Sequence, residues 1–114
     1  ATASGLAQRL VDEGLRMSDH PGIVFKDGPS GRRAALAFGP DVWEIVKALR
    51  ELDERGDRAV GAGAELLALP EAKIRVAMRY YAAYPDEIDA EIDEAERMSV
   101  EAERAWQVER RLLA

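Results

Sequence analysis

The chain has 114 residues with 22 acidic and 16 basic side chains, a net charge of −6, and it contains no cysteine and one histidine. This length fits one globular domain, and the lack of cysteine excludes disulfides and thiolate metal sites. No apolar run approaches the roughly 20 residues that span a bilayer, so we expect a cytoplasmic protein that makes no membrane contact.

The N-terminal segment predicts a helix. Ser4 is suited to cap it, because a serine hydroxyl can accept a hydrogen bond from a backbone N–H of the first turn, and the apolar pattern runs to about Met17. Residues 18–22 then break the helix, since they contain Pro21 followed by a glycine. His20 lies in this break and is expected to be a turn residue. The residues that share the apolar side of the helix are Leu6, Leu10, Val11 and Leu15.

A β-hairpin and a second helix are predicted next. Two short β-prone runs flank residues 27–31, whose sequence Asp-Gly-Pro-Ser-Gly is typical of a turn. Pro40 marks another stop, and residues 42–49 have the apolar spacing of a helix, with Trp43 on its flank. The charged segment from Glu51 to Asp57 is expected to be a connecting loop.

Residues 58–89 have the layout of a helix-turn-helix that is followed by an acidic helix. The turn would be residues 68–70, because Pro70 has the fixed φ and the missing N–H that suit the start of a helix. The residues expected near one face of the first helix are Ala59, Val60, Gly63, Leu66 and Leu67. Those expected to point inward from the second helix are Ile74, Ala77, Met78 and Tyr81.

Cations of the second helix are predicted to contact DNA. Lys73, Arg75 and Arg79 would lie on its outer side, where lysine and arginine can reach phosphates and guanine edges. Arg32 and Arg33 of the hairpin complete the predicted DNA-binding set, and a DNA-binding dimer should gather all five on one face. The same pattern also fits two core helices with a solvated basic face. A protein-interaction or dimerisation module without DNA binding therefore stays open.

The last predicted element is a long acidic helix that begins at Pro85. From Asp86 onward the chain holds ten acids and four arginines, so the whole net charge lies there and the body is neutral. A continuous helix would be roughly 40 Å long and would overhang a body with a radius of gyration of about 13 Å. The residues expected to bind a partner protein are Met98, Trp106, Val108, Leu112, Leu113, Arg104 and Arg110. Alternatively, Trp106 folds back onto the first helix around Leu6 and Leu10.

These elements predict a mostly α fold: a winged helix-turn-helix-like domain with one N-terminal β-hairpin and a long C-terminal helix. The predicted division is a body of residues 1–85 and a tail of residues 86–114. The acids of residues 86–94 lack the glycine and the alternate spacing of a calcium loop. Gly61 and Gly63 follow no strand, unlike the glycines of a phosphate loop, and are expected to let two helices approach closely. We expect no catalytic residue, no metal, no cofactor and no enzyme activity.

Four stretches of the chain, HPGIVF, GPSGRRAAL, GPDVWEIVKAL and RYYAAYPDEID, together resemble the antitoxins of the domain-of-unknown-function-433 family, including VapB-type members. In that family a β segment with a glycine-arginine element precedes a three-helix unit. The resemblance covers about residues 20–89. The matching positions are Gly31, Arg32 and Arg33, then residues 41–49, then Ala77, Tyr80 and Tyr81.

The resemblance implies an antitoxin of a type II toxin-antitoxin pair. Such a protein would be a homodimer that neutralises a PIN-like ribonuclease toxin through its C-terminal segment and represses its own operon by binding operator DNA. The segment after Asp89 is variable in the family, so the resemblance implies no role for its individual residues.

Overall fold

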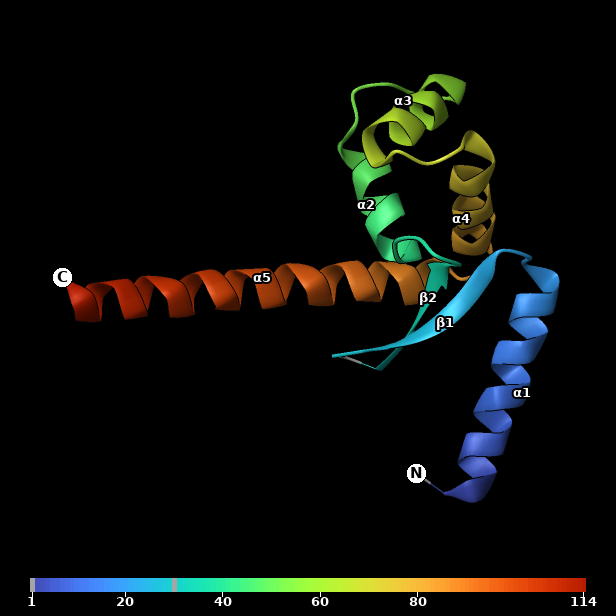
Figure 1. Ribbon diagram of the computed structural model, residues 1–114, viewed down its shortest axis with the longest axis horizontal. Helices are drawn as coiled ribbons and strands as arrows, with labels where there is room; N and C mark the ends of the chain where they lie inside the picture. The colour runs from blue at the N-terminus through green and yellow to red at the C-terminus, as the bar shows by residue number, and fades with distance from the viewer. Residues whose placement is uncertain (1, 30) are drawn as a thin grey trace.

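Figure 1 shows the computed structural model of the protein, which describes residues 2–29 and 31–114. Its elements in chain order are α1 (Ala3–Asp19), β1 (Ile23–Gly28), β2 (Gly31–Leu36), α2 (Val42–Glu51), α3 (Asp57–Leu67), α4 (Glu71–Ala83) and α5 (Pro85–Leu113). The structure therefore confirms a mostly α fold with one antiparallel hairpin and a long C-terminal helix. Within the described ranges, we find no helix with the length and apolar character needed to cross a membrane.

The observed ends of the elements follow from local chemistry. Thr2, not Ser4 as expected, caps α1, since its hydroxyl oxygen accepts a hydrogen bond from the Gly5 N–H at 3.0 Å. The hairpin pairs residues 23–28 with residues 31–36, and Gly31 adopts a φ of 118°, which favours glycine. Ser30, in the predicted turn, lies outside the described residues. Pro70 immediately precedes α4, as the sequence predicts.

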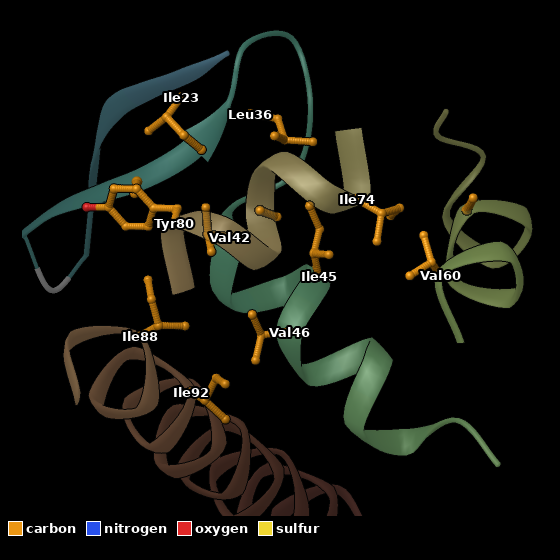
Figure 2. Packing of buried hydrophobic residues seen from close by; sticks show 13 residues of the cluster. Ile23, Leu36, Val42, Ile45, Val46, Val60, Ile74, Tyr80, Ile88 and Ile92 are labelled. Atoms are coloured by element: carbon orange, nitrogen blue, oxygen red, sulfur yellow. The ribbon is translucent and has the colours of Figure 1, made fainter. Parts of the chain in front are cut away.

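The core lies where α2, α4, the start of α5 and the inner end of the hairpin meet, and α3 packs on its edge (Figure 2). The largest fully buried side chains are Tyr80, Leu36, Ile45, Ile74, Ile88 and Val42. A Cβ atom at Gly63 would stand 2.7 Å from a methyl group of Leu49. Glycine therefore allows the close approach of α3 to α2 that the sequence predicts.

The predicted inward faces of the helix pair are partly wrong. In α4 the buried residues are Ile74, Ala77 and Tyr80, whereas Met78 is 38% exposed. Helical spacing permits either choice, and the core selected the side that carries Tyr80 because the hairpin and α1 cover that side. In α3, Leu66 is 62% exposed for the same kind of reason: the core contacts lie on the side of Val60 and Ala64.

α1 lies outside the core. All four residues of its predicted apolar side are exposed, and the residue that α1 buries is Glu13. Figure 1 shows α1 extending past the hairpin, away from α3 and α4. The helix is held to the body through charged and aromatic contacts, so its apolar spacing did not predict which side would be covered.

α5 projects far beyond the body. Its 29 residues span roughly 43 Å, and the radius of gyration is 16.9 Å, well above the roughly 13 Å of a compact chain of this size. Ile88 and Ile92 are core residues, so the predicted division at residue 86 falls before the last part of the body. Residues 96–114 are all exposed, and we refer to them as the projecting half of α5.

Trp106 does not fold back onto α1. Its side chain is 55% exposed, and the C-terminal end of α5 and the N-terminal end of α1 lie far apart in Figure 1. Because α5 is one continuous helix, it carries Trp106 away from the body. The prediction of an overhanging helix is confirmed, and the alternative of a core tryptophan is wrong for this chain.

Candidate functional site

Two of the three predicted cations of α4 share one exposed side of the helix. Arg75 and Arg79 are one turn apart, and Arg75 lies 3.4 Å from the Asp57 carboxylate at the start of α3. Lys73 stands roughly 160° around the helix axis from Arg75. Its Nζ atom would lie 3.8 Å from a Cβ atom at Gly22, beside the hairpin. The structure therefore groups Arg75 with Arg79 and places Lys73 elsewhere.

Arg32 and Arg33 lie near the turn of the hairpin, whereas its opposite end packs beside α4. Arg32 makes a two-pronged contact with Glu13, with its Nη2 atom 2.6 Å from Oε1 and its Nε atom 3.0 Å from Oε2. It also donates to Asp27 at 3.2 Å. Arg33 Nε is 2.7 Å from an oxygen of Asp41, an ion pair without hydrogen-bond geometry. Within one protomer these two arginines are not brought together with Arg75 and Arg79.

The contact between Glu13 and Arg32 fastens α1 to the hairpin. Glu13 is buried, and the hydrogen bond from Arg32 lowers the pKa of its carboxyl below the usual value. A buried carboxylate of this kind is stable only with its partner in place. Arg32 thus has a structural role that its predicted role in DNA binding does not include, and no local signal in the sequence marks Glu13 as its partner.

A second polar network joins α1, α4 and α5 around Tyr80. Arg16 donates to the Tyr80 hydroxyl at 2.9 Å and to both oxygens of Glu87 at 3.0 Å. Its guanidinium also lies 3.9 Å from the centre of the Tyr84 ring. Tyr80 donates to Glu87 at 3.1 Å, and burial raises the pKa of its hydroxyl, which keeps that proton in place. This network fixes the direction in which α5 leaves the body.

A third network fixes α5 from its other side. Arg50 of α2 donates to the Tyr81 hydroxyl at 2.7 Å and also to Asp89. Tyr81 donates to the same Asp89 oxygen at 3.0 Å. The hydrogen bond from Arg50 lowers the pKa of the Asp89 carboxyl. The first turns of α5 are therefore held by polar contacts on two sides and by Ile88 and Ile92 in between.

A groove of about 630 Å³ lies between the turn of the hairpin, Trp43 and residues 90–99 of α5. Both side-chain oxygens of Glu91 are buried there, with no hydrogen-bond partner among the described residues. Burial raises the pKa of Glu91 to about 7, and Glu87 and Asp41 add to this rise while Arg33 opposes it. Sequence reasoning missed this burial, because the acids of residues 86–94 look alike in the sequence and were all expected on a solvated helix face.

The predicted partner-binding residues all lie on the projecting half of α5. Its large apolar side chains are exposed, from 41% at Met98 to 84% at Leu112. The guanidinium of Arg110 lies 5.6 Å from the centre of the Trp106 ring. Arg104 follows one turn after Val100. The members of the set are Met98, Trp106, Val108, Leu112, Leu113, Arg104 and Arg110.

These residues do not share one side of the helix. Trp106 and Leu113 continue the side on which Ile88 and Ile92 pack against the body, since they follow at multiples of about 3.5 residues. Val108 and Arg104 point roughly to the opposite side. The stripe that is buried at the start of α5 is thus uncovered along the projecting half.

The chain matches no protein-family model, no curated protein and no solved structure. The resemblance to domain-of-unknown-function-433 antitoxins therefore stays a prediction that rests on the sequence stretches alone. Among residues 2–29 and 31–114, no group of three or more histidine, aspartate or glutamate side chains is arranged to hold a metal ion.

Proposed function

We propose that the protein is an antitoxin of a type II toxin-antitoxin pair. Its projecting half of α5 binds and neutralises a PIN-like ribonuclease toxin, and the homodimer binds operator DNA and represses the operon. The observation that carries the proposal is the exposure of every residue from 96 to 114, Trp106 included. A helical segment of this length is marginally stable alone in water, so a partner that covers it also stabilises it.

The chemistry of the projecting half fits such a partner. A PIN active site is a cluster of carboxylates, and Arg104, Arg110 and Arg111 are cations that can approach it. The exposed apolar side chains supply contact area, and a tryptophan that enters a desolvated pocket commonly contributes much of the binding energy. The projecting half, in which four arginines offset four glutamates, therefore supplies both cations for such a site and an apolar anchor.

The exposed side of α4 supports the DNA-binding half of the proposal. Arg75 and Arg79 lie on it one turn apart, and their neighbours there are small residues such as Ala72 and Ala82, both exposed. Small side chains let a helix approach the floor of a groove while the arginines reach phosphates or bases. In this assignment Lys73 lies outside the contact side of α4. Arg32 and Arg33 contribute only where a phosphate displaces their carboxylate partners.

A non-catalytic protein-interaction module without DNA binding is the second candidate. It is favoured by the pairing of Arg32, Arg33 and Arg75 with carboxylates, because each such contact competes with a phosphate. It keeps the same use of α5. DNA binding is the property that separates the two candidates.

Arg79→Glu is expected to weaken binding to the promoter of the protein's own operon and to reduce the slope of log affinity against log salt by about 1. The physical reason is the loss of one phosphate contact and of the counterion that it releases. Fluorescence anisotropy with a labelled promoter fragment at several salt concentrations measures both quantities.

Lys73→Glu is the matched control, since it makes the same charge change on another side of α4. A smaller effect than that of Arg79→Glu is expected. If the wild-type protein does not bind the promoter, with or without the protein encoded by the adjacent gene, the DNA-binding half of the proposal fails and the second candidate stands.

Truncation after Ser99 is expected to leave the thermal midpoint of the body nearly unchanged in dilute solution and to abolish neutralisation of the toxin. All core residues precede this point, whereas truncation after Asp89 removes the buried Ile92 and should lower the midpoint. Circular dichroism melts and a ribonuclease assay with the PIN-like product of the adjacent gene make the measurements.

Trp106→Ala is expected to reduce affinity for that toxin by about 2 kcal/mol or more without changing the melting of the body. Gln107→Ala, on a neighbouring side of the same turn, serves as its control. A marked loss of thermal stability in Trp106→Ala would show that the tryptophan is structural and would remove the basis of the toxin-binding proposal.

A further inference from the structure

We propose that the projecting half of α5 also pairs, antiparallel, with the same segment of a second copy of this chain, and that this pairing and toxin binding exclude each other. The exclusion rests on the proposed function, whereas the self-association does not. Three features favour a second copy as the occupant: the distribution of apolar residues, the self-complementary charges and the length of the exposed helix.

The apolar surface of the projecting half extends mainly to one side of the helix. Ala102, Trp106 and Leu113 extend the stripe of Ile88 and Ile92 past the body. The side chains along one flank of this extended stripe are also apolar. Glu109 is the charged residue that lies between the stripe and this flank. The apolar flank is formed by Met98, Ala105 and Leu112.

The other flank carries Glu103 and Arg110. They are seven residues apart, roughly 10 Å along the axis, too far to pair within one helix. Glu103 accepts a hydrogen bond from Gln107 at 3.3 Å, and Arg110 lies over the Trp106 ring. Each of the two charges therefore remains available to an opposite charge brought from outside.

Antiparallel pairing supplies those charges. If a two-fold axis passes between Trp106 and Gln107, Glu103 of each helix lies opposite Arg110 of the other, which gives two equivalent ion pairs. The apolar flanks then also face each other. A parallel pairing would instead set each charged flank against the partner's apolar flank, so charge and apolar surface favour the antiparallel direction.

The length of the uncovered helix fits the same arrangement. With this axis Leu113 of the second copy lies opposite Val100, next to the groove lined by Trp43 and Met98. The two helices overlap along residues 99–114, roughly 24 Å of the exposed part of α5. Each body lies at the start of its own α5, so antiparallel pairing sets the two bodies at opposite ends of the pair.

Sedimentation equilibrium of the full chain tests the proposal. The wild-type chain is expected to be a dimer at micromolar concentrations. In the Glu103→Arg variant and in the Arg110→Glu variant, both symmetry-related ion pairs become pairs of like charges. Each variant should therefore weaken dimerisation about tenfold or more. Arg111→Glu is the matched control, because it makes the same charge change one residue further on, on the outward side, and should leave the dimer unchanged.

Charge exchange makes the test specific for the antiparallel register. A mixture of the Glu103→Arg and Arg110→Glu variants should form a heterodimer about as tightly as the wild type, and the double variant should regain self-association. Circular dichroism confirms that each variant keeps its fold. A second copy bound through other residues would not produce this rescue in the double variant.

Several results would overturn the proposal. One is a wild-type chain that stays monomeric throughout the micromolar range, and another is a dimer that Arg111→Glu weakens as much as Arg110→Glu. A dimer that survives truncation after Ser99 would place the interface elsewhere. Toxin that binds a dimer still paired through α5 would overturn the exclusion. Self-association of a chain that binds no toxin would contradict the proposed function and would still support the pairing of the two α5 helices.

Discussion

Replacing Tyr80 with alanine is expected to lower the free energy of unfolding by about 3 to 5 kcal/mol, a large part of the stability of a domain of this size. The Tyr80 side chain is fully buried. Its ring lies within 4.8 to 6.4 Å of the rings of His20, Phe25 and Tyr84, measured between centroids. The substitution leaves a cavity where α1, the hairpin, α4 and α5 meet, so it should also release the direction of α5.

Two further variants divide this effect between the ring and the hydroxyl. Tyr80→Phe keeps the ring and removes only the hydrogen bonds to Arg16 and Glu87, so a loss of about 1 to 2 kcal/mol is expected. Tyr81→Ala removes the neighbouring, partly exposed tyrosine and should cost less than Tyr80→Ala. Urea denaturation gives the three values. A loss below about 1 kcal/mol in Tyr80→Ala would contradict the packing of this junction.

Glu91→Gln is expected to raise the free energy of unfolding by about 2 to 3 kcal/mol at pH 8 and by less than about 1 kcal/mol at pH 5. Burial raises the pKa of Glu91 from 4.5 to about 7. The folded state therefore retains a proton that the unfolded chain releases, and the wild-type protein loses stability as the pH rises from about 4.5 through 7. Glutamine has no carboxyl group to ionise, so the variant escapes this loss.

The pH dependence identifies ionisation as the cause. Glu87, Asp41 and Arg33 are the charged groups that act on Glu91, and none of them changes in the variant. Glu94→Gln, in the same groove, is the control, because the Glu94 carboxylate pairs with Arg97 and should not reproduce the gain. Urea denaturation at pH 5, 6, 7 and 8 makes the comparison. An equal gain at pH 5 and pH 8 would assign the effect to packing instead.

Local rules predicted the order and approximate ends of the elements. Pro21, Pro40, Pro70 and Pro85 mark the breaks because proline constrains its own φ and the residue before it, whatever the rest of the chain does. The hairpin followed from a turn sequence between two β-prone runs, and its register is the one that such a short turn permits. The projection of α5 followed from length alone, since no body of this size can cover so long a helix.

Local sequence did not predict which face of a helix packs against the core. Spacing admits Met78 or Tyr80 as a core residue of α4, and only the hairpin and α1 decided for Tyr80. The apolar side of α1 looked like a core face and is exposed, because Glu13 and Arg16 attach that helix through its polar side. A periodic pattern predicts that a helix has an apolar face and a polar face, but not which element packs against each face.

The roles of charged residues depended most on the fold. The order of residues alone shows that Arg32 and Arg33 follow the hairpin turn and that acids fill the start of α5. The pairing of Arg32 with Glu13, 19 residues away, and the burial of both Glu91 oxygens depend on how the elements pack. Local chemistry sets backbone conformation within a few residues, whereas the state of a charge depends on burial and on partners that are distant in the sequence.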